Sequence, residues 1–345
     1  MFRRILAALV TIALSATLLV LVWPQLFSLQ RVAGIAQLVS FRSAAAAAAA
    51  VVLVVFLVLA TANRSFRRLG LSLAALALVF ALLNTAVLAS RGFGGTPLPA
   101  RVAADLTVMS WNTLGDAPGP EAIAQLAIDS GADVVSLPET TEKTAKAVAV
   151  LMTTAGLPMT SHTVAHGRIS KSRSTSVLIG TTLGAYHLDE SAGSTVTFPT
   201  LVMVPDSGSG PTIVAVHPVA PLPSELASWD SDLHWLAGAC PPGDVILAGD
   251  FNATLDHLAG LESEPGANLG ACTDAASRAH SGARGSWPTG VPALLGAPID
   301  HVMTTKNWAV VGARVVEALD GAGSDHRPIV VRLRPTAKPG SGATP

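Results

Sequence analysis

The chain has 345 residues and a net charge of −1 at pH 7, but this near-neutral total hides two different parts. Residues 1–104 contain nine arginines and no acidic residue. Residues 105–334 contain all 23 acidic residues against 12 lysines and arginines, a net charge of about −11. This asymmetry argues against one uniform soluble domain and indicates a basic membrane part followed by an acidic globular part.

Three long apolar segments in the first part predict membrane-spanning helices, at about residues 5–25, 44–62 and 71–89. Each is long enough to cross the ~30 Å hydrocarbon core of a bilayer as a helix. A signal peptide is the alternative for the first segment, but its apolar run is long for that role and no clear Ala-x-Ala site follows it. We therefore predict a three-helix anchor over residues 1–90.

The arginines that flank these segments predict their orientation in the membrane. Five of them belong on the side of the N-terminus and three on the opposite side. In chain order, the first group is Arg3, Arg4, Arg64, Arg67 and Arg68, and the second is Arg31, Arg42 and Arg91. The excess favours a cytoplasmic N-terminus in a multi-pass protein of the cell membrane. Three crossings then place the globular part outside the cytoplasm.

Residues 91–104 are rich in Gly and Pro and predict a linker, and residues 335–345 predict a disordered tail. The two cysteines, Cys240 and Cys272, do not form a Cys-x-x-Cys pair, which argues against a zinc site. They are interpreted either as one disulfide, if the domain faces an oxidising space, or as two buried thiols.

The globular part, residues 105–334, predicts strands and helices in a mixed order. Predicted helices cover residues 120–130, 143–155 and 224–239, the last with Ser224 as a candidate N-cap. Predicted strands cover residues 106–112, 133–137, 175–181, 195–204, 212–216, 245–248, 299–304, 310–316 and 329–333. Residues 255–298 predict an irregular segment. Early alternation of strands and helices followed by runs of strands favours a mixed sheet with helices outside.

Polar side chains able to hold a metal ion, a water molecule or a phosphate stand at the ends of several predicted strands. Asp250 and Asn252 directly follow the apolar strand 245–248, on one face of an extended chain. The candidates, in chain order, are Asn112, Glu139, His217, Asp250, Asn252, Asp300, Asp325 and His326. Carboxylate and amide oxygens suit a hard cation such as Mg²⁺ or Mn²⁺. Histidines beside carboxylates suit proton transfer and charge stabilisation near neutral pH.

Several common catalytic motifs are missing from the sequence. There is no Gly-x-x-x-x-Gly-Lys loop, no Gly-x-Ser-x-Gly elbow and no His-Glu-x-x-His pair. Nucleotide hydrolysis on a phosphate-binding loop, serine-hydrolase chemistry and metalloprotease chemistry therefore lose support.

Seven short segments, taken together, resemble the endonuclease/exonuclease/phosphatase superfamily with the deoxyribonuclease-I-like fold. In chain order they are Ser110-Trp111-Asn112, Leu137-Pro138-Glu139, Val216-His217-Pro218, Gly249-Asp250-Phe251-Asn252, Ser286-Trp287-Pro288, Ile299-Asp300-His301 and Gly323-Ser324-Asp325-His326-Arg327-Pro328. The resemblance covers about 230 residues and leaves out the three apolar segments. It implies an α/β fold, a four-layer α/β/β/α sandwich, with the active site at one end of two packed sheets.

The resemblance also implies a role for each candidate around a bound Mg²⁺ or Mn²⁺ ion. Glu139 corresponds to the principal metal carboxylate, with Asn112 and Asp325 beside the same ion, directly or through water. Asp250 corresponds to the residue that orients or deprotonates the attacking water, and Asn252 to the one that holds this water and the phosphate.

The histidines complete this implied site. His326 acts on a phosphoryl oxygen or as general base, with Asp300 fixing its tautomer and raising its pKa. His217 corresponds to a second histidine that is a candidate acid for the leaving oxygen. Arg327 either contacts phosphate or packs in the wall of the site. His301 and Trp287 are interpreted as packing residues, and Pro298 stands where many relatives have a basic residue.

These residues predict a membrane-anchored, metal-dependent phosphoesterase that acts outside the cytoplasm by attack of an activated water. Its substrate is a phosphodiester or phosphomonoester, either in nucleic acid or in a lipid or small molecule. The globular part is acidic and has a single tyrosine, so it lacks the basic stripe and the stacking aromatic residues that are typical of nucleic-acid binders. The alternative is an inactive member that binds a phosphoryl ligand or a protein partner. The oligomeric state stays open.

Overall fold

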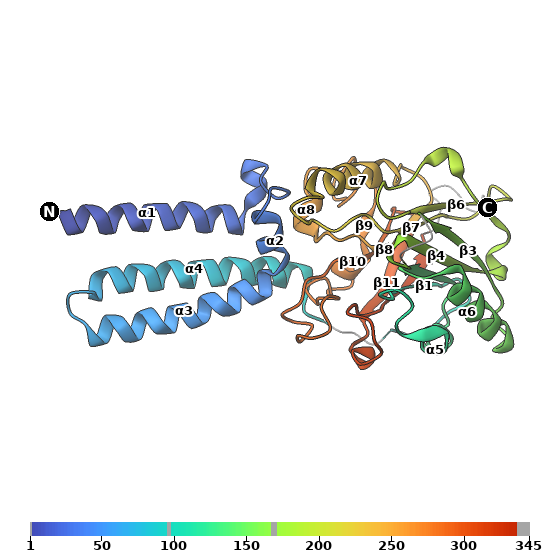
Figure 1. Cartoon of the computed structure of the whole chain (residues 1–345), viewed down its shortest axis with the longest axis horizontal. Helices are drawn as coiled ribbons and strands as arrows, with labels where there is room; N and C mark the ends of the chain where they lie inside the picture. The colour runs from blue at the N-terminus through green and yellow to red at the C-terminus, as the bar shows by residue number, and fades with distance from the viewer. Residues whose placement is uncertain (1, 95–97, 167–170, 337–345) are drawn as a thin grey trace, which may run out of the picture. The chain divides into compact units, whose positions relative to one another are not determined.

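The computed structural model describes residues 2–94, 98–166 and 171–336, and the predicted tail at 337–345 lies outside the described residues. The chain divides into two compact units, Met1–Ser90 and Arg91–Pro345, each of which is described by itself (Figure 1).

The first unit is helical. Within the described residues, three helices are long and apolar enough to cross a membrane. They are α1 (Phe2–Val22), α3 (Arg42–Ala62) and α4 (Arg67–Arg91). Because Ala, Val and Leu occupy every face of these helices, water is a poor solvent for them and a bilayer is a good one. The first helix ends before the predicted residue 25, at Val22, and Pro24 begins the short 3₁₀ helix η1 (Pro24–Phe27).

A polar contact connects two of the apolar helices. Arg42, the first residue of α3, donates a 2.8 Å hydrogen bond from Nη1 to Oδ1 of Asn84 in α4, and both residues are buried. The Asn84 amide also donates to the carbonyl of Phe80, at 2.9 Å. Asn84 therefore packs between helices, and such hydrogen bonds contribute about 1 kcal/mol in membranes. The short helix α2 (Ile35–Ser40) precedes α3.

The second unit contains two six-stranded sheets, with strand orders β11-β12-β1-β2-β4-β3 and β5-β6-β7-β8-β10-β9. The strands of the first sheet are β1 (Leu106–Ser110), β2 (Val134–Pro138), β3 (Met159–Ala165), β4 (Ser174–Gly180), β11 (Trp308–Val315) and β12 (Ile329–Pro335). Those of the second are β5 (Tyr186–Leu188), β6 (Leu201–Pro205), β7 (Thr212–Val216), β8 (Val245–Asp250), β9 (Thr273–Asp274) and β10 (Asp300–Thr304).

Each sheet is built around one parallel pair of strands, β1 with β2 and β7 with β8, and the strands beside each pair run antiparallel to it. A parallel pair needs a crossover connection, which the helices α5 (Gly119–Ser130) and α7 (Leu226–Gly238) provide. The helix α5 ends at Gly131, whose φ of 61° is the left-handed conformation that glycine adopts readily.

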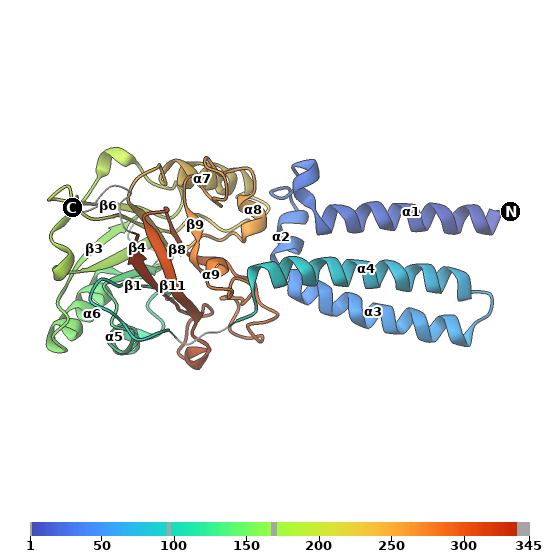
Figure 2. The same cartoon turned by 180° about the vertical axis from the view of Figure 1, so that it is seen from behind.

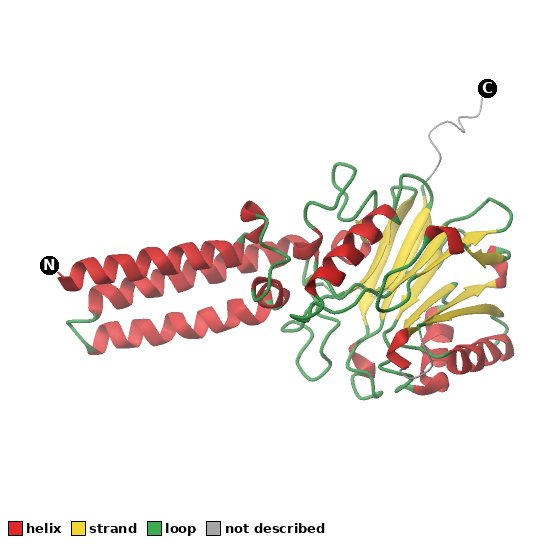
Figure 3. Ribbon diagram, turned by 45° about the horizontal axis from the view of Figure 1, so that its top comes forward, coloured by secondary structure: helices red, strands yellow, loops and turns green. Residues whose placement is uncertain are grey.

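The two sheets pack face to face on a shared apolar core. Val108 of β1 and Ala248 of β8 lie in this core, whereas Met109 of β1 points to the opposite face and packs under the helices. The alternation follows from the two-residue period of a strand. Figures 1 and 2 show α5 and α6 (Glu142–Thr154) on one side of the sheets and α7 on the other. Figure 3 shows the sheets between them. This arrangement confirms the predicted α/β/β/α sandwich.

Several predicted elements differ in their bounds. The strand predicted at 195–204 begins only at Leu201, because hydroxyls of Ser194 and Thr195 bond to Thr200 and Phe198 and hold a loop there. The strands β3 and β5 lie at the edges of their sheets. Their sequences show no clear alternation of apolar and polar residues, so they were not among the predicted strands. Ser224 is not the N-cap of α7; Glu225 occupies that position without a side-chain capping bond.

Two further differences concern the irregular segment and the tail. The segment 255–298 contains the short helices α8 (Leu255–Leu258) and α9 (Ala275–Arg278) as well as β9. The strand β12 extends to Pro335, the first residue of the predicted tail, because its end pairs with Trp308 of β11.

The two cysteines form a disulfide. It joins Cys240, just after α7, to Cys272, just before β9, with the two Cα atoms 6.0 Å apart and both side chains fully buried. Of the two interpretations left open by the sequence, the structure has the bonded one.

Candidate active site

The predicted candidates meet at one edge of the sandwich because of the strand directions. The strands β1, β2, β7 and β8 all end at this edge, and β10 and β12 begin there. Asp300, the first residue of β10, is the cross-strand partner of Asp250, the last residue of β8. Each parallel pair delivers the residues that follow it to one edge of its sheet, and the Asn112–Asp250 hydrogen bond shows that the two edges meet, as the family resemblance implied.

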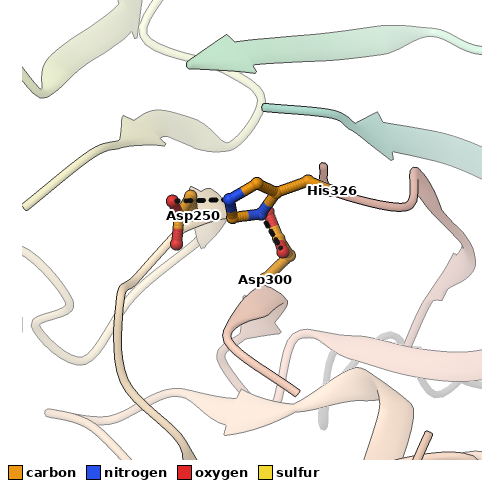
Figure 4. Close-up of side chains that lie close together, drawn as sticks. All are labelled: Asp250, Asp300 and His326. Atoms are coloured by element: carbon orange, nitrogen blue, oxygen red, sulfur yellow. Dashed lines mark hydrogen bonds and ion pairs between the residues drawn. The ribbon is translucent and has the colours of Figure 1, made fainter. Parts of the chain in front are cut away.

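His326 lies between two aspartates (Figure 4). Its Nδ1 donates a 2.8 Å hydrogen bond to Oδ2 of Asp300, and its Nε2 lies 3.8 Å from Oδ2 of Asp250. Burial by itself lowers the pKa of His326, but the charges of Asp300 and Asp250 outweigh burial and raise it to about 10. The two carboxylates therefore favour the protonated form of the ring. The backbone N–H of Asp300 donates to the hydroxyl of Ser286 at 3.1 Å, which fixes the start of β10.

Asp250 is almost fully buried and is surrounded by hydrogen-bond donors. The backbone N–H of Asn252 donates to its Oδ1 at 2.8 Å, and the side-chain amide of Asn112 donates to its Oδ2 at 3.0 Å. Burial raises the pKa of Asp250 to about 7, helped by the charge of Asp300 and opposed by that of His326. A carboxylate with such a pKa is suited to accept a proton near neutral pH.

Two site residues adopt backbone conformations that are uncommon for non-glycine residues. Glu139 has a φ of 56° and Asn252 a φ of 47°. The carbonyl of Glu139 accepts a 2.9 Å hydrogen bond from the hydroxyl of Thr113, and the indole of Trp229 donates to the carbonyl of Asn252 at 3.1 Å. These hydrogen bonds stabilise the two residues in backbone conformations that are unfavourable by themselves. Such strained conformations are often found at functional sites.

The Glu139 carboxylate lies beside the aspartates. The amide of Asn112 donates to its Oε1 at 3.2 Å, and burial raises the pKa of Glu139. The Asn112 amide thus joins Glu139 to Asp250. Its Oδ1 accepts the backbone N–H of Leu114 at 3.0 Å, so this oxygen is already engaged.

The Asp325 carboxylate has one engaged oxygen and one without a partner. The indole of Trp287 donates to its Oδ2 at 2.9 Å. Its Oδ1 is buried, makes no hydrogen bond within the described part of the chain, and lies 3.9 Å from Nε2 of His326. Trp287, interpreted from the sequence as a packing residue, therefore also orients Asp325.

His217 ends the strand β7 and completes the site on its far side. Its Nε2 lies 4.0 Å from Oε1 of Glu139, and only 1% of the residue is exposed. Burial lowers the pKa of His217 to about 3, and the positive charge of His326 acts in the same direction. The pKa values of the two histidines are therefore shifted in opposite directions, upward for His326 and downward for His217.

Arg327 packs in the wall of the site. Its guanidinium group bonds to both carboxylate oxygens of Asp320, at 2.8 and 2.6 Å, and to backbone carbonyls of the loop 285–291. His301 bonds to Asp274 and to the carbonyl of Ala253, both at 2.9 Å, away from the candidate site. Of the two interpretations of Arg327, the structure therefore has the one in which this residue packs in the wall of the site. His301 makes structural contacts, as interpreted from the sequence.

The oxygen-rich donor set fits a hard divalent cation. Ligand atoms of Asp250, Asp300 and His326 lie within 4.8 Å of one another. A hydrogen bond already occupies Nδ1 of His326, however, so we regard this trio as a proton-handling group. Glu139 and the unpartnered Oδ1 of Asp325 are the better metal ligands, since carboxylate oxygens are what Mg²⁺ and Mn²⁺ prefer.

The fold is an α/β/β/α sandwich, and one of its edges is rich in carboxylates and histidines. The chain belongs to the endonuclease/exonuclease/phosphatase family, whose family model matches residues 109–326. The matched segment begins just before Asn112 and ends at His326, so it includes the whole candidate site. The resemblance read from the sequence is thereby confirmed.

Solved structures share this fold at low sequence identity. An endonuclease/exonuclease/phosphatase from Beutenbergia cavernae is 20% identical, over 69% of this chain and 73% of its own, with a TM-score of 0.48. A D. rerio TDP2 humanized by 14 mutations is 16% identical, over 67% of this chain and 100% of its own, with a TM-score of 0.50. No curated protein sequence matches the chain.

Proposed function

We propose that this protein is a membrane-anchored phosphoesterase that depends on Mg²⁺ or Mn²⁺ and hydrolyses its substrate by direct attack of water. The observation that carries the proposal is the pairing of the His326 cation with Asp250 and Asp300, next to Glu139. A general base, a fixed cation and free carboxylate oxygens within one cluster are what hydrolysis of a phosphoester needs.

The bound metal ion would be held by Glu139 and Asp325, with the Asn112 amide holding Glu139 beside Asp250. When bound, it supplies positive charge to the phosphoryl oxygens and makes a nearby water more acidic. Asp325 is prepared for this role because the indole of Trp287 fixes its other oxygen. Asn112 could coordinate the ion directly only if its side-chain amide flipped, because its oxygen accepts a hydrogen bond from the backbone N–H of Leu114.

The attacking water would be oriented by Asp250, which takes its proton. Asp250 is suited to this role because its pKa is raised to about 7 by burial. Asn252 lies two residues after Asp250 and would hold the water and the phosphate. Its side-chain amide donates a 3.0 Å hydrogen bond to the carbonyl of Pro218. His326, fixed by Asp300, would donate a hydrogen bond from Nε2 to a phosphoryl oxygen and stabilise the negative charge that develops there.

The membrane unit, residues 1–90, would anchor the catalytic domain, residues 105–334, outside the cytoplasm. The excess of arginines on the N-terminal side of the membrane supports this orientation. The buried Cys240–Cys272 disulfide supports it independently, because disulfides persist in oxidising spaces and are rare in the cytoplasm.

The substrate class follows from the tether and the charge. A domain with a net charge of about −11 repels the phosphates of a nucleic acid beyond those that the metal ion neutralises. A domain held near a bilayer meets phospholipid headgroups and other envelope phosphoesters at high local concentration. We therefore favour lipid or small-molecule phosphoesters over nucleic acids.

The test uses the full chain in nanodiscs with three substrates: supercoiled plasmid, phospholipid vesicles and bis(4-nitrophenyl) phosphate. We expect Mg²⁺-dependent hydrolysis that disappears in the Asp250→Ala variant. Nicking of the plasmid without lipid hydrolysis would identify a nuclease instead. A folded protein that binds inorganic phosphate but hydrolyses none of the three would support the inactive, ligand-binding alternative.

A further inference from the structure

His217 has an environment that the roles described so far do not explain. Its ring lies at the end of β7 and stacks on Phe198, with the ring centroids 4.6 Å apart and the planes 14° from parallel. Its backbone N–H donates to the hydroxyl of Thr200 at 3.0 Å. The ring is therefore held in one position, and its two nitrogens face different surroundings.

The nitrogen Nδ1 faces a hydroxyl group. Thr175 Oγ1 lies 3.3 Å away, and this is the one hydrogen bond that the described residues give to Nδ1. Thr175 is fully buried in β4, where it pairs with Pro138 of β2, the residue before Glu139. The contact thus crosses from the first sheet to the second, next to the end of the strand that precedes the candidate metal ligand.

The nitrogen Nε2 faces the catalytic centre. It is buried, has no hydrogen-bond partner among the described residues, and lies 4.0 Å from the Glu139 carboxylate. An unpartnered polar atom in this position is costly unless a ligand engages it. Its neighbour Glu139 is also the residue that we propose for the metal ion, so Nε2 is directed at the place where the phosphoryl group would lie.

The contacts of the two ring nitrogens select one tautomer. With the proton on Nδ1, the lone pair of Nε2 would face the negative carboxylate of Glu139, which is unfavourable. With the proton on Nε2, the N–H faces the carboxylate, and Nδ1 is free to accept the hydroxyl hydrogen of Thr175. The second arrangement gives Nδ1 a hydrogen bond, removes the repulsion at Nε2, and makes the Thr175 hydroxyl a donor.

We propose that Thr175 is a positioning residue that donates its hydroxyl to Nδ1 of His217 and so keeps the Nε2–H of this histidine directed at the phosphoryl group. This inference rests on the proposed function. A carboxylate in place of Thr175 would bind an Nδ1–H and favour an imidazolium acid. A hydroxyl that donates to Nδ1 leaves the proton on Nε2, so His217 donates its Nε2–H to a non-bridging phosphoryl oxygen.

The kinetic test compares Thr175→Val, which keeps the shape and removes the hydroxyl, with Thr175→Ser, which keeps the hydroxyl. In the full chain, we expect Thr175→Val to lower kcat for bis(4-nitrophenyl) phosphate about ten- to hundredfold with KM little changed. Thr175→Ser should restore most of the activity. Thr305→Val is the matched control, since Thr305 is equally buried but follows the opposite end of β10 from Asp300. Wild-type kcat in Thr175→Val would overturn the inference.

The second readout is the tautomer itself, measured by ¹⁵N NMR of histidine-labelled full chain, with His217→Asn to assign the signal. We expect the proton on Nε2 in the wild type and a mixture of tautomers in Thr175→Val. A proton on Nδ1 in the wild type would overturn the inference. If the wild type hydrolyses no phosphoester, the proposed function fails, and the tautomer alone then decides the role of Thr175.

Discussion

Asp300 and Asp250 are cross-strand partners, yet only Asp300 accepts a hydrogen bond from His326, at 2.8 Å, whereas Asp250 lies 3.8 Å from the other ring nitrogen. The antiparallel register of β8 and β10 thus places two carboxylates on opposite sides of one imidazole. In the proposed mechanism, the first carboxylate fixes the ring and the second acts on water.

Asp300→Asn tests the fixing carboxylate. The amide keeps the shape but loses the negative charge that favours the His326 cation, so we expect kcat/KM to fall about 100- to 10,000-fold. The fold should persist, as circular dichroism can show. Asp244→Asn is the control, because Asp244 precedes the opposite end of β8 and bonds to Trp308 instead. Equal losses in the two variants would contradict the role of Asp300.

The pH dependence of stability tests Asp250. Its pKa is raised to about 7 in the folded protein from about 3.8, so the folded state holds a proton that the unfolded state releases between these values. The free energy of unfolding of the metal-free wild type should therefore decrease as pH rises from 4 to 7, relative to Asp250→Asn. Urea titrations of both proteins in EDTA measure this difference. A difference that does not change with pH would contradict the raised pKa.

The backbone of Glu139 gives a prediction about strain. A φ of 56° is unfavourable for every residue with a Cβ and acceptable for glycine. Glu139→Gly and Glu139→Ala should both abolish Mg²⁺-dependent activity, but the glycine variant should be more stable than the alanine variant by about 1 kcal/mol. Thermal unfolding of the two variants provides the measurement. An alanine variant at least as stable would show that the conformation carries no strain.

The disulfide gives a prediction about stability without a role in catalysis. It closes a loop with a sequence separation of 32 residues, so the Cys240→Ser/Cys272→Ser protein should lose about 2–4 kcal/mol of unfolding free energy. The bond lies outside the cluster of site residues, and kcat should stay close to that of the wild type at 25 °C. A large loss of kcat in protein that is still folded would count against this separation.

Cysteine labelling on intact cells tests the proposed topology. In the Cys240→Ser/Cys272→Ser background, Ser209→Cys in an exposed turn after β6 should react with a membrane-impermeant maleimide. Ser65→Cys, between α3 and α4, should react only after the cells are opened. The reverse pattern would place the catalytic domain in the cytoplasm.

The sandwich, with one site at its end, was implied by the resemblance of seven short motifs to a known family. The strand pattern by itself placed Asn112, Glu139 and Asp250 only at the ends of separate strands, because it does not show which strands are neighbours or how two sheets pack. The contact of Thr175 with His217 could not be predicted, because it depends on how one sheet packs on the other. Threonine is also common in β-strands, so its presence in β4 gives no signal of a role in the site.

The loops show a second limit of the sequence. Segment 285–298 has no periodicity, and its path decides that the Trp287 indole reaches Asp325 and that Arg327 is enclosed by carbonyls. Both residues were identified from motifs, but their partners come from tertiary structure. Side chains that act through a partner on a distant segment are therefore the part of the site that needed the structure.

The most direct test of the central claim is the rate of bis(4-nitrophenyl) phosphate hydrolysis by the full chain, in Mg²⁺ and in EDTA, for the wild type, Asp250→Asn and Asp244→Asn. We predict hydrolysis that requires Mg²⁺, is lost in Asp250→Asn and is retained in Asp244→Asn. Hydrolysis that persists in EDTA, or that survives in Asp250→Asn, would contradict a metal-dependent phosphoesterase in which Asp250 activates the water.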